Sequence, residues 1–150
     1  MMKNLFNPAD VSSLVERINN LDPGTQPLWG KMNVAQMLAH CNVSMETFTG
    51  KKTIKRLFIG RIVGTLMKKN ILSEKPFGRN SPTDKSYVIK GTPDFEAEKA
   101  KAIASLKNIP AAGPSGVTMH PHPFFGHFTP EQWAVFEWKH FDHHLRQFGV

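Results

Sequence analysis

Apolar side chains recur at spacings of three and four residues in four separate stretches of the chain. This period places them along one face of an α-helix. In chain order the positions are Val11, Leu14, Val15 and Ile18; Val34, Met37, Leu38, Cys41, Met45 and Phe48; Phe95, Ala102, Ile103, Leu106 and Ile109; and Ala134, Trp138, Phe141, Leu145 and Phe148. The pattern predicts four amphipathic helices, each with one face turned toward a core.

Capping residues precede each of the four apolar stripes. The signals are Asn7-Pro8, Asn33 followed by Gln36, Thr92-Pro93-Asp94, and Thr129-Pro130 followed by Gln132. Asn, Asp and Thr side chains accept hydrogen bonds from the free N–H groups of a first turn, and a glutamine three residues later completes a capping box. We expect the first helix to stop at Asp22, the second at Gly50 and the third before Pro110.

Two long connections, residues 51–91 and residues 111–127, join these helices, and both contain several Pro and Gly residues. No stretch of the chain has the strict alternation of apolar and polar positions that is typical of a strand. Four long helices without strands predict an all-α fold, a helical bundle that forms one domain over residues 1–150.

Residues 51–70 interleave basic and apolar positions. The basic ones are Lys51, Lys52, Lys55, Arg56, Arg61, Lys68 and Lys69, and the apolar ones are Ile54, Leu57, Phe58, Ile62, Val63, Leu66 and Met67. Gly60 and Gly64 weaken an independent helix here, and we attach no meaning to their spacing outside a long apolar segment. The segment fits either a crossover helix with a solvated basic face or an interfacial helix on a membrane, and we favour the crossover helix.

Composition and charge narrow the class of protein. A hydrophobic content of 40% fits a globular protein, and no apolar run is long enough to span a membrane. Cys41 is the single cysteine and the first residues lack a signal peptide, so we expect a cytoplasmic protein. A net charge of +7 attracts anions, but the chain has no nucleic-acid recognition motif, so we expect neither a specific nucleic acid nor a membrane as partner.

Three histidines indicate a metal site. His140 and His144 are four residues apart and share a face beside the apolar stripe of the last expected helix. His40 borders the apolar stripe of the second expected helix, with Gln36 and Ser44 one turn away on either side. Metal sites in bundles are built from facing helices, and three imidazoles leave a coordination position open for water or substrate. The alternative is that His40 is a hydrogen-bonded core residue and that the other two sit in a basic C-terminal helix without a ligand.

Other residues near these positions are candidates for supporting roles. Glu137 shares the face of His140 and His144, so it could orient an imidazole, act as a general base or simply pair with a surface cation. Cys41 lies on an apolar stripe and is expected to be an inert core residue. His143 is expected to be exposed or to support a ligand. The loop histidines, which are His120, His122 and His127, are expected to be solvated.

Two segments resemble the DinB-like superfamily of metal-binding four-helix bundles. Residues 29–40, WGKMNVAQMLAH, resemble that family's tryptophan-containing start of helix two, which ends in its first ligand histidine. Residues 140–147, HFDHHLRQ, are similar to its His-x-x-His-His-Arg-Gly-Gln run, in which the first and third histidines bind the metal. Residues 122–126 and 145–150 look like an uncharacterised branch of unknown function.

The resemblance implies an up-down-down-up bundle with a long crossover between helices two and three, supplied here by residues 51–91. It also implies that His40, His140 and His144 are the metal ligands. The chain departs from the family pattern at one point, because Leu145-Arg146 stand where the family has Arg-Gly. A displacement by one residue turns that arginine about 100° around the helix.

Two functions follow as expectations. The first is a metal-dependent enzyme in which a divalent ion, zinc or nickel, activates a water or a low-molecular-weight thiol toward a small-molecule substrate, as an S-transferase, an isomerase or a hydrolase. The second is a non-catalytic, stress-related bundle that binds a metal or another ligand. A basic adaptor that meets an anionic partner through residues 51–69 is a third reading. A homodimer through helix faces is also expected.

Overall fold

The computed structural model describes residues 2–150, which form five α-helices and no strand. The α-helices are α1 (Pro8–Asn19), α2 (Val34–Phe48), α3 (Thr65–Ile71), α4 (Phe95–Ala112) and α5 (Pro130–Gln147). Shorter helical turns are η1 (Gly60–Gly64), η2 (Lys85–Tyr87) and η3 (Gly113–Gly116). The expected all-α fold is therefore confirmed. Within the described part of the chain, no helix combines the length and the apolarity needed to cross a membrane.

Three of the four helix starts agree with the capping residues in the sequence, and α4 begins two residues later than the Thr92-Pro93 signal predicts. Asn7 caps α1 and Asp94 caps α4, while complete capping boxes of Asn33 with Gln36 and of Thr129 with Gln132 open α2 and α5. Each cap satisfies N–H groups that the first turn of a helix leaves free. These boundaries are local, which is why the sequence predicts them.

The expected end of α4 before Pro110 is wrong, because the helix continues to Ala112. Pro110 lies in the last turn, where its missing N–H removes one intrahelical hydrogen bond and interrupts no further turn of α4. The helix ends instead at Gly113, which adopts a φ of 59° that disfavours residues with a Cβ.

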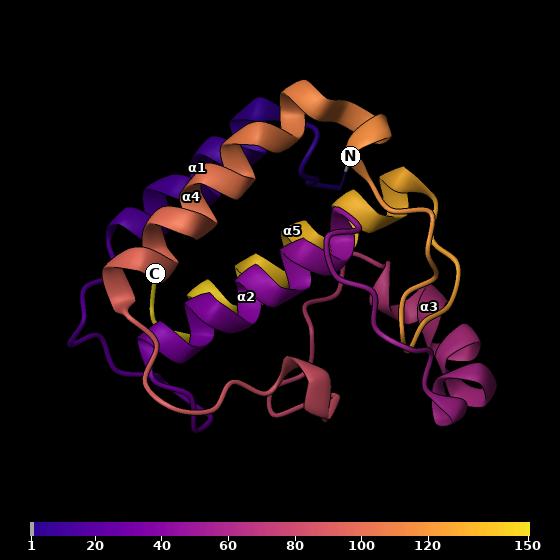
Figure 1. Cartoon of the computed structure of the whole chain (residues 1–150), viewed down its shortest axis with the longest axis horizontal. Helices are drawn as coiled ribbons and strands as arrows, with labels where there is room; N and C mark the ends of the chain where they lie inside the picture. Colours follow the sequence, from indigo (N-terminus) through magenta and orange to yellow (C-terminus); the bar gives the residue numbers. More distant parts are fainter. Residues whose placement is uncertain (1) are drawn as a thin grey trace.

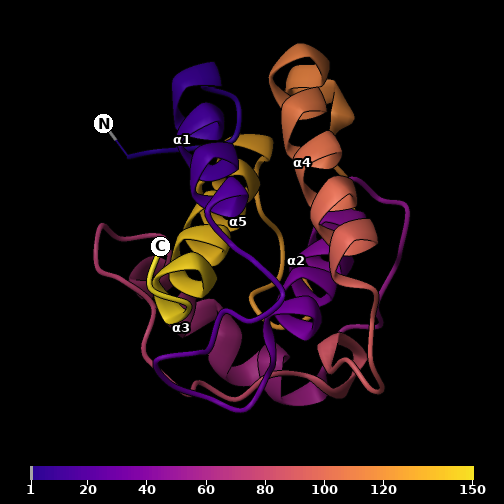
Figure 2. The same cartoon turned by 90° about the vertical axis from the view of Figure 1, so that its left-hand side faces the viewer.

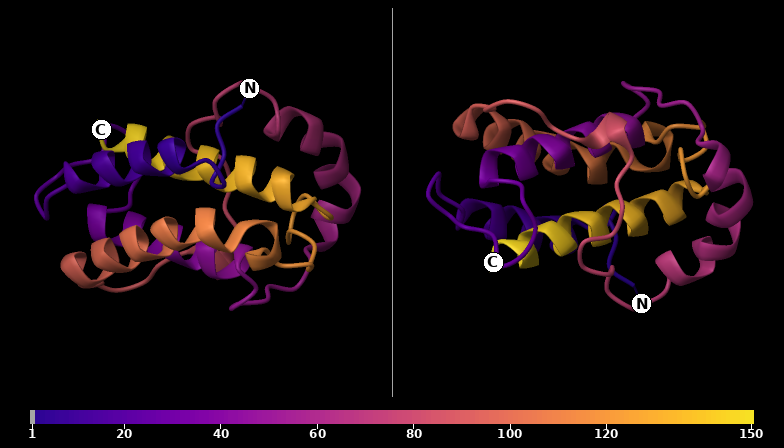
Figure 3. Two further views of the ribbon diagram at one scale, coloured as in Figure 1. Left: turned by 90° about the horizontal axis from the view of Figure 1, so that it is seen from above. Right: turned by 90° about the horizontal axis from the view of Figure 1, so that it is seen from below.

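The four longer helices pack in two pairs around the core. Figure 2 shows α1 beside α5 on one side of the molecule and α2 beside α4 on the other, and Figure 3 shows the same pairs from above and below. Each pair also contacts the other, through α1 with α4 and α2 with α5. The largest fully buried side chains are Trp133, Phe48, Phe141, Leu5, Leu14, Ile18, Met37, Leu38, Met45, Leu106 and Leu145, together with one ionisable residue, Glu137.

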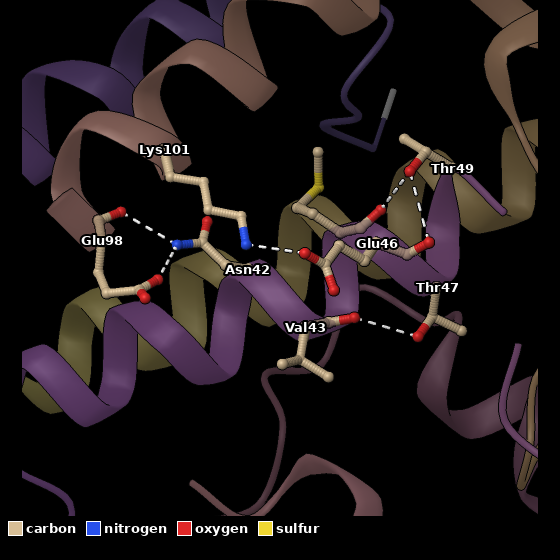
Figure 4. Close-up of polar contacts among 8 residues, drawn as sticks. Asn42, Val43, Glu46, Thr47, Thr49, Glu98 and Lys101 are labelled. Carbon is tan, nitrogen blue, oxygen red and sulfur yellow. Dashed lines mark hydrogen bonds and ion pairs between the residues drawn. The ribbon is translucent and has the colours of Figure 1, made fainter. Parts of the chain in front are cut away.

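Polar contacts fix α2 against α4 at one edge of this core (Figure 4). The buried Asn42 amide donates to the backbone carbonyl of Glu98 at 3.0 Å and to its carboxylate at 2.6 Å. Lys101 pairs with Glu46 at 2.7 Å, but both side chains are partly exposed, so that pair adds little stability. The Asn42 contact is directional and buried, so it sets the relative position of the two helices.

Residues 58–71 are helical and lie at one end of the molecule (Figures 1 and 3). Gly60 and Gly64 are the buried positions of this segment, and they meet the backbone of Phe124. A Cβ at Gly60 would lie 2.5 Å from the Phe124 carbonyl oxygen, and one at Gly64 would overlap it. The expectation that this glycine spacing has no meaning is wrong. Two glycines four residues apart allow the helix to pack directly against the backbone of Phe124.

Candidate functional site

His40 from α2 and His140 and His144 from α5 meet in the structure. One ring nitrogen from each lies within 4.8 Å of the other two. The closest pair is His40 Nε2 and His140 Nε2, at 2.9 Å. The cause is the packing of α2 against α5, which aligns the single histidine of one helix with the i,i+4 pair of the other. The three residues that the sequence singled out are therefore brought together.

His40 is oriented by a backbone group. Its Nδ1 lies 2.9 Å from the carbonyl oxygen of Tyr87, in η2. A carbonyl can only accept, so Nδ1 carries the proton and the Nε2 lone pair of the neutral ring points toward His140. The long connection between α2 and α4 thus contributes to the histidine cluster through its main chain.

His144 is oriented by Gln147. The Gln147 amide donates from Nε2 to the Trp29 carbonyl at 2.8 Å, which leaves its Oε1 as the acceptor that lies 2.8 Å from His144 Nδ1. His144 Nδ1 therefore carries a proton, and the lone pair of the neutral ring is on Nε2. The same amide holds the loop before α2 against the end of α5.

His140 has a carboxylate behind it. Its Nδ1 lies 3.7 Å from Glu137 Oε2, and both atoms are buried without a hydrogen-bond partner. The other oxygen of Glu137 accepts a 2.6 Å hydrogen bond from the Ser44 hydroxyl. Glu137 is fully buried and is not among the residues that line the adjoining cavity. Of the roles considered for Glu137, this position favours orientation of an imidazole over attack on a substrate or a surface ion pair.

Burial determines the charges of the cluster. It lowers the pKa of His40, lowers that of His140 well below its usual value and lowers that of His144 to about 2. Burial also raises the pKa of Glu137 to about 7, although the Ser44 hydrogen bond opposes this shift. At neutral pH the three imidazoles are thus uncharged, which is the form that binds metals.

The three residues fit a divalent cation. Two nitrogens bound tetrahedrally to one zinc ion are roughly 3.3 Å apart, a value that lies between the 2.9 Å of the closest pair and the 4.8 Å limit of the set. If His140 binds the cation through Nε2, its proton is on Nδ1. The unpartnered Glu137 oxygen can then accept a hydrogen bond from this N–H. A bound cation would thus pair two buried atoms that otherwise have no hydrogen-bond partner, His140 Nδ1 and Glu137 Oε2.

A cavity of about 670 Å³ opens beside the histidines. Its walls combine the histidines with aromatic residues, among them Trp29, Phe77, Phe124, Phe125 and Phe136. Because the three histidines line the cavity, a fourth position on a bound ion would face it. The size and the aromatic walls suit a small organic molecule.

The expectation that His122 is a solvated loop residue is wrong. His122 is only 7% exposed, and its Nδ1 accepts from the N–H groups of both Phe124 and Phe125 at 3.1 Å. Burial lowers the pKa of His122 to about 3, so it is neutral with its proton on Nε2. The residues around His122 in the sequence do not indicate its burial, because its role is to accept hydrogen bonds within a tight turn between residues 122 and 126.

The remaining histidines and the cysteine occupy simpler environments. His120 and His127 are exposed, as expected. His143 is partly buried against the Trp29 ring, with centroids 5.8 Å apart, and lines the cavity. Cys41 is fully buried and burial raises the pKa of its thiol, which agrees with an inert core residue. Sequence reasoning missed Tyr87, since a backbone carbonyl leaves no side-chain pattern.

Comparison with known proteins gives a family and nothing narrower. No curated protein and no solved structure matches the chain. The family described as "Protein of unknown function (DUF1569)" matches residues 4–149, nearly the whole sequence, including every residue of the histidine site. The chain therefore belongs to the DUF1569 family of proteins of unknown function.

Proposed function

We propose that the protein is a metalloprotein of the DinB-like type, in which His40, His140 and His144 hold a divalent cation, zinc or nickel. One observation carries the proposal. Three buried or nearly buried histidines from two helices present nitrogens within 4.8 Å of one another on the wall of a cavity. Desolvation makes such a cluster unfavourable in its charged form, and a bound cation would compensate for the burial of its polar groups.

The up-down-down-up bundle is part of the same proposal. The colour gradient in Figure 1 supports it, because α2 and α4 run in one direction while α1 and α5 run in the other. The connection between α2 and α4, residues 49–94, contains η1, α3 and η2 and supplies the crossover that two parallel neighbours require.

The proposed chemistry is that of a metal-dependent enzyme. A bound divalent ion would lower the pKa of a water or a low-molecular-weight thiol and polarise an electrophile. The chain itself would orient the ligands, through Tyr87 to His40, Gln147 to His144 and Glu137 to His140. The aromatic walls of the cavity would exclude water from a small organic substrate and position it.

The arginine next to the histidine pair contributes nothing to this cavity. Arg146 lies 3.6 Å from Asp142, has half of its side chain exposed and is not among the residues that line the cavity. If a thiol is used, its anionic groups would have to be held elsewhere. The position of Arg146 therefore gives no support to a thiol that this residue would hold, and water and a thiol both stay as candidates for the activated group.

The alternative is a non-catalytic protein that binds a metal or another ligand with the same histidines. It shares the metal site and differs in having no turnover. A panel of thiols, electrophiles and hydrolysable esters, with and without a chelator, separates the two. The cytoplasmic location and the homodimer remain predictions.

Elemental analysis of untagged protein tests the site. We expect near-stoichiometric zinc or nickel in the wild type and none in His140→Ala/His144→Ala. His143→Ala is the matched control, because it removes a neighbouring histidine of α5 and should keep the metal. An empty wild type that stays empty after soaking with both metals would refute the site. If the metal is present but the panel shows no turnover, the non-catalytic alternative holds.

A further inference from the structure

Large apolar side chains are exposed together on one segment of the molecule. Among the described residues, nine large hydrophobic side chains are exposed, and five of them lie between residues 58 and 67. These five are Phe58, Ile59, Ile62, Leu66 and Met67. Phe58 and Leu66 keep 77% and 80% of their surface in contact with solvent. Such a concentration on one short helix indicates an interaction surface.

The exposure follows from which side of the helix packs. Gly60 and Gly64 occupy the buried side, against the backbone of Phe124, so no apolar side chain of the helix is needed there. Phe58, Ile62 and Leu66 are spaced by four and form a stripe on the opposite side. The expected crossover helix with a solvated basic face is therefore only half correct, because an apolar stripe is solvated as well.

Exposed basic residues flank this stripe in the sequence. Lys55, Arg61 and Lys69 are exposed, and no acidic residue occurs between residues 51 and 73. Lys68 is not counted among the free basic residues, because its ammonium donates to the His127 carbonyl and lies over the Phe128 ring. The surface thus combines an apolar ridge with flanking lysine and arginine, while the whole chain carries a net charge of +7.

The sequence leads us to expect no membrane partner, but the exposed apolar stripe favours the interfacial helix instead. We propose that residues 55–69 bind the surface of an anionic lipid bilayer. The helical segment of residues 58–71 lies at one end of the molecule (Figure 3). Its exposed apolar side chains can therefore enter the boundary between headgroups and acyl chains, while flanking lysine and arginine pair with anionic headgroups. A second copy of the chain fits less well, since it would bring two basic surfaces of the same sign together.

The docked surface would lie beside the mouth of the cavity. Ile59 and Met67 belong to the exposed group and also line the cavity. The proposed lipid-binding surface and the cavity of the histidines thus share these two side chains. The binding of lipid itself rests on residues 55–69 and does not depend on a metal at the histidine site.

Co-sedimentation with vesicles tests the proposal. We expect the full chain to bind vesicles that contain phosphatidylglycerol and to bind pure phosphatidylcholine vesicles much more weakly. Ile62→Ser/Leu66→Ser should weaken binding roughly tenfold or more, because it removes the apolar insertion. Arg61→Gln/Lys69→Gln should weaken it roughly 25-fold, at about fivefold for each charge, and raising salt should mimic this loss.

Matched controls use exposed residues elsewhere. Met119→Ser and Lys90→Gln alter an exposed apolar and an exposed basic side chain and should leave binding unchanged. Circular dichroism and the melting temperature verify that each variant is folded, and His140→Ala/His144→Ala should bind vesicles like the wild type. Absence of vesicle binding, equal binding to neutral vesicles, or binding that survives both double substitutions would overturn the proposal. So would a dimer that Ile62→Ser/Leu66→Ser dissolves, which would assign the surface to a second copy.

Discussion

The Ser44 hydroxyl on α2 donates a 2.6 Å hydrogen bond to the Glu137 carboxylate on α5, inside the core of the protein. Glu137 is completely buried, and its second oxygen faces His140 Nδ1 at 3.7 Å. A buried ionisable group without a full set of partners is unfavourable in a purely structural role. Its position beside His140 Nδ1 fits the proposed role of a carboxylate that orients a metal-binding imidazole.

Glu137→Gln should weaken zinc binding about 10- to 100-fold, the usual effect of losing a group that orients a ligand. The substituted amide keeps an acceptor for Ser44, so the fold should persist. Competition with a chromophoric chelator measures the affinity. Glu131→Gln, an exposed change in the first turn of the same helix, is the control and should bind zinc like the wild type. Unchanged affinity in Glu137→Gln would show that the carboxylate does not orient the ligand.

The stability of the metal-free protein should fall as pH drops below about 6.5. Burial lowers the folded-state pKa of His122 to about 3 and of His144 to about 2, so the unfolded chain binds protons that the folded chain does not. Each such histidine then removes up to about 1.4 kcal/mol for every pH unit below 6.5. Urea unfolding at pH 7.5 and at pH 5.5, with chelator present, measures the slope. A stability that does not change with pH would contradict the burial of neutral histidines.

Glu137 should act in the opposite direction over part of this range. Burial raises its folded-state pKa to about 7 from 4.5, so the folded protein holds a proton there that the unfolded chain has lost. Between pH 4.5 and 7 this carboxyl therefore stabilises the fold as the pH falls. The metal-free Glu137→Gln variant lacks that opposing contribution and should lose stability more steeply than the wild type on acidification. An identical slope in the two proteins would show that Glu137 does not titrate in this range.

His122→Phe should destabilise the protein by about 1–3 kcal/mol. The ring keeps its place among Phe125, Phe128 and Trp133, but the N–H groups of residues 124 and 125 lose their acceptor. Asparagine can accept from the same two donors, so His122→Asn should restore the turn at the expense of ring packing. Urea unfolding measures both variants, with His120→Ala as an exposed control. If His122→Phe is as stable as the wild type, the turn does not need the imidazole.

Gly64→Ala should release α3 from the turn at Phe124, because the added Cβ overlaps the Phe124 carbonyl. We expect a loss of about 1–3 kcal/mol and faster cleavage of residues 51–72 by protease. Gly78→Ala is the control, since its nearest contact would be an ordinary 3.4 Å from Ser81. Protease resistance equal to that of the control would contradict the close packing.

Much of the helical framework could be predicted from the sequence because it depends on neighbouring residues. Asn33 with Gln36 and Thr129 with Gln132 form their capping boxes within one turn, and the apolar stripes follow the helical period. The spacing of His140 and His144 likewise guarantees a shared face on any helix that contains them. These features need no knowledge of distant parts of the chain.

Tertiary structure decided the features that join distant segments. His40 meets His140 across 100 residues because α2 packs on α5, and Tyr87 supplies a carbonyl from η2, a short helical turn that the sequence pattern does not predict. His122 is buried because aromatic residues of α5 and its own turn close around it. Gly64 has a role only because a loop backbone, 60 residues further along the chain, lies against it. The sequence alone determined which residues could form a site and which faces were apolar, whereas the packing of helices determined which of them came together. The physical reason is that a hydrogen-bonded turn is a local interaction, while a contact between helices depends on how the whole core is filled.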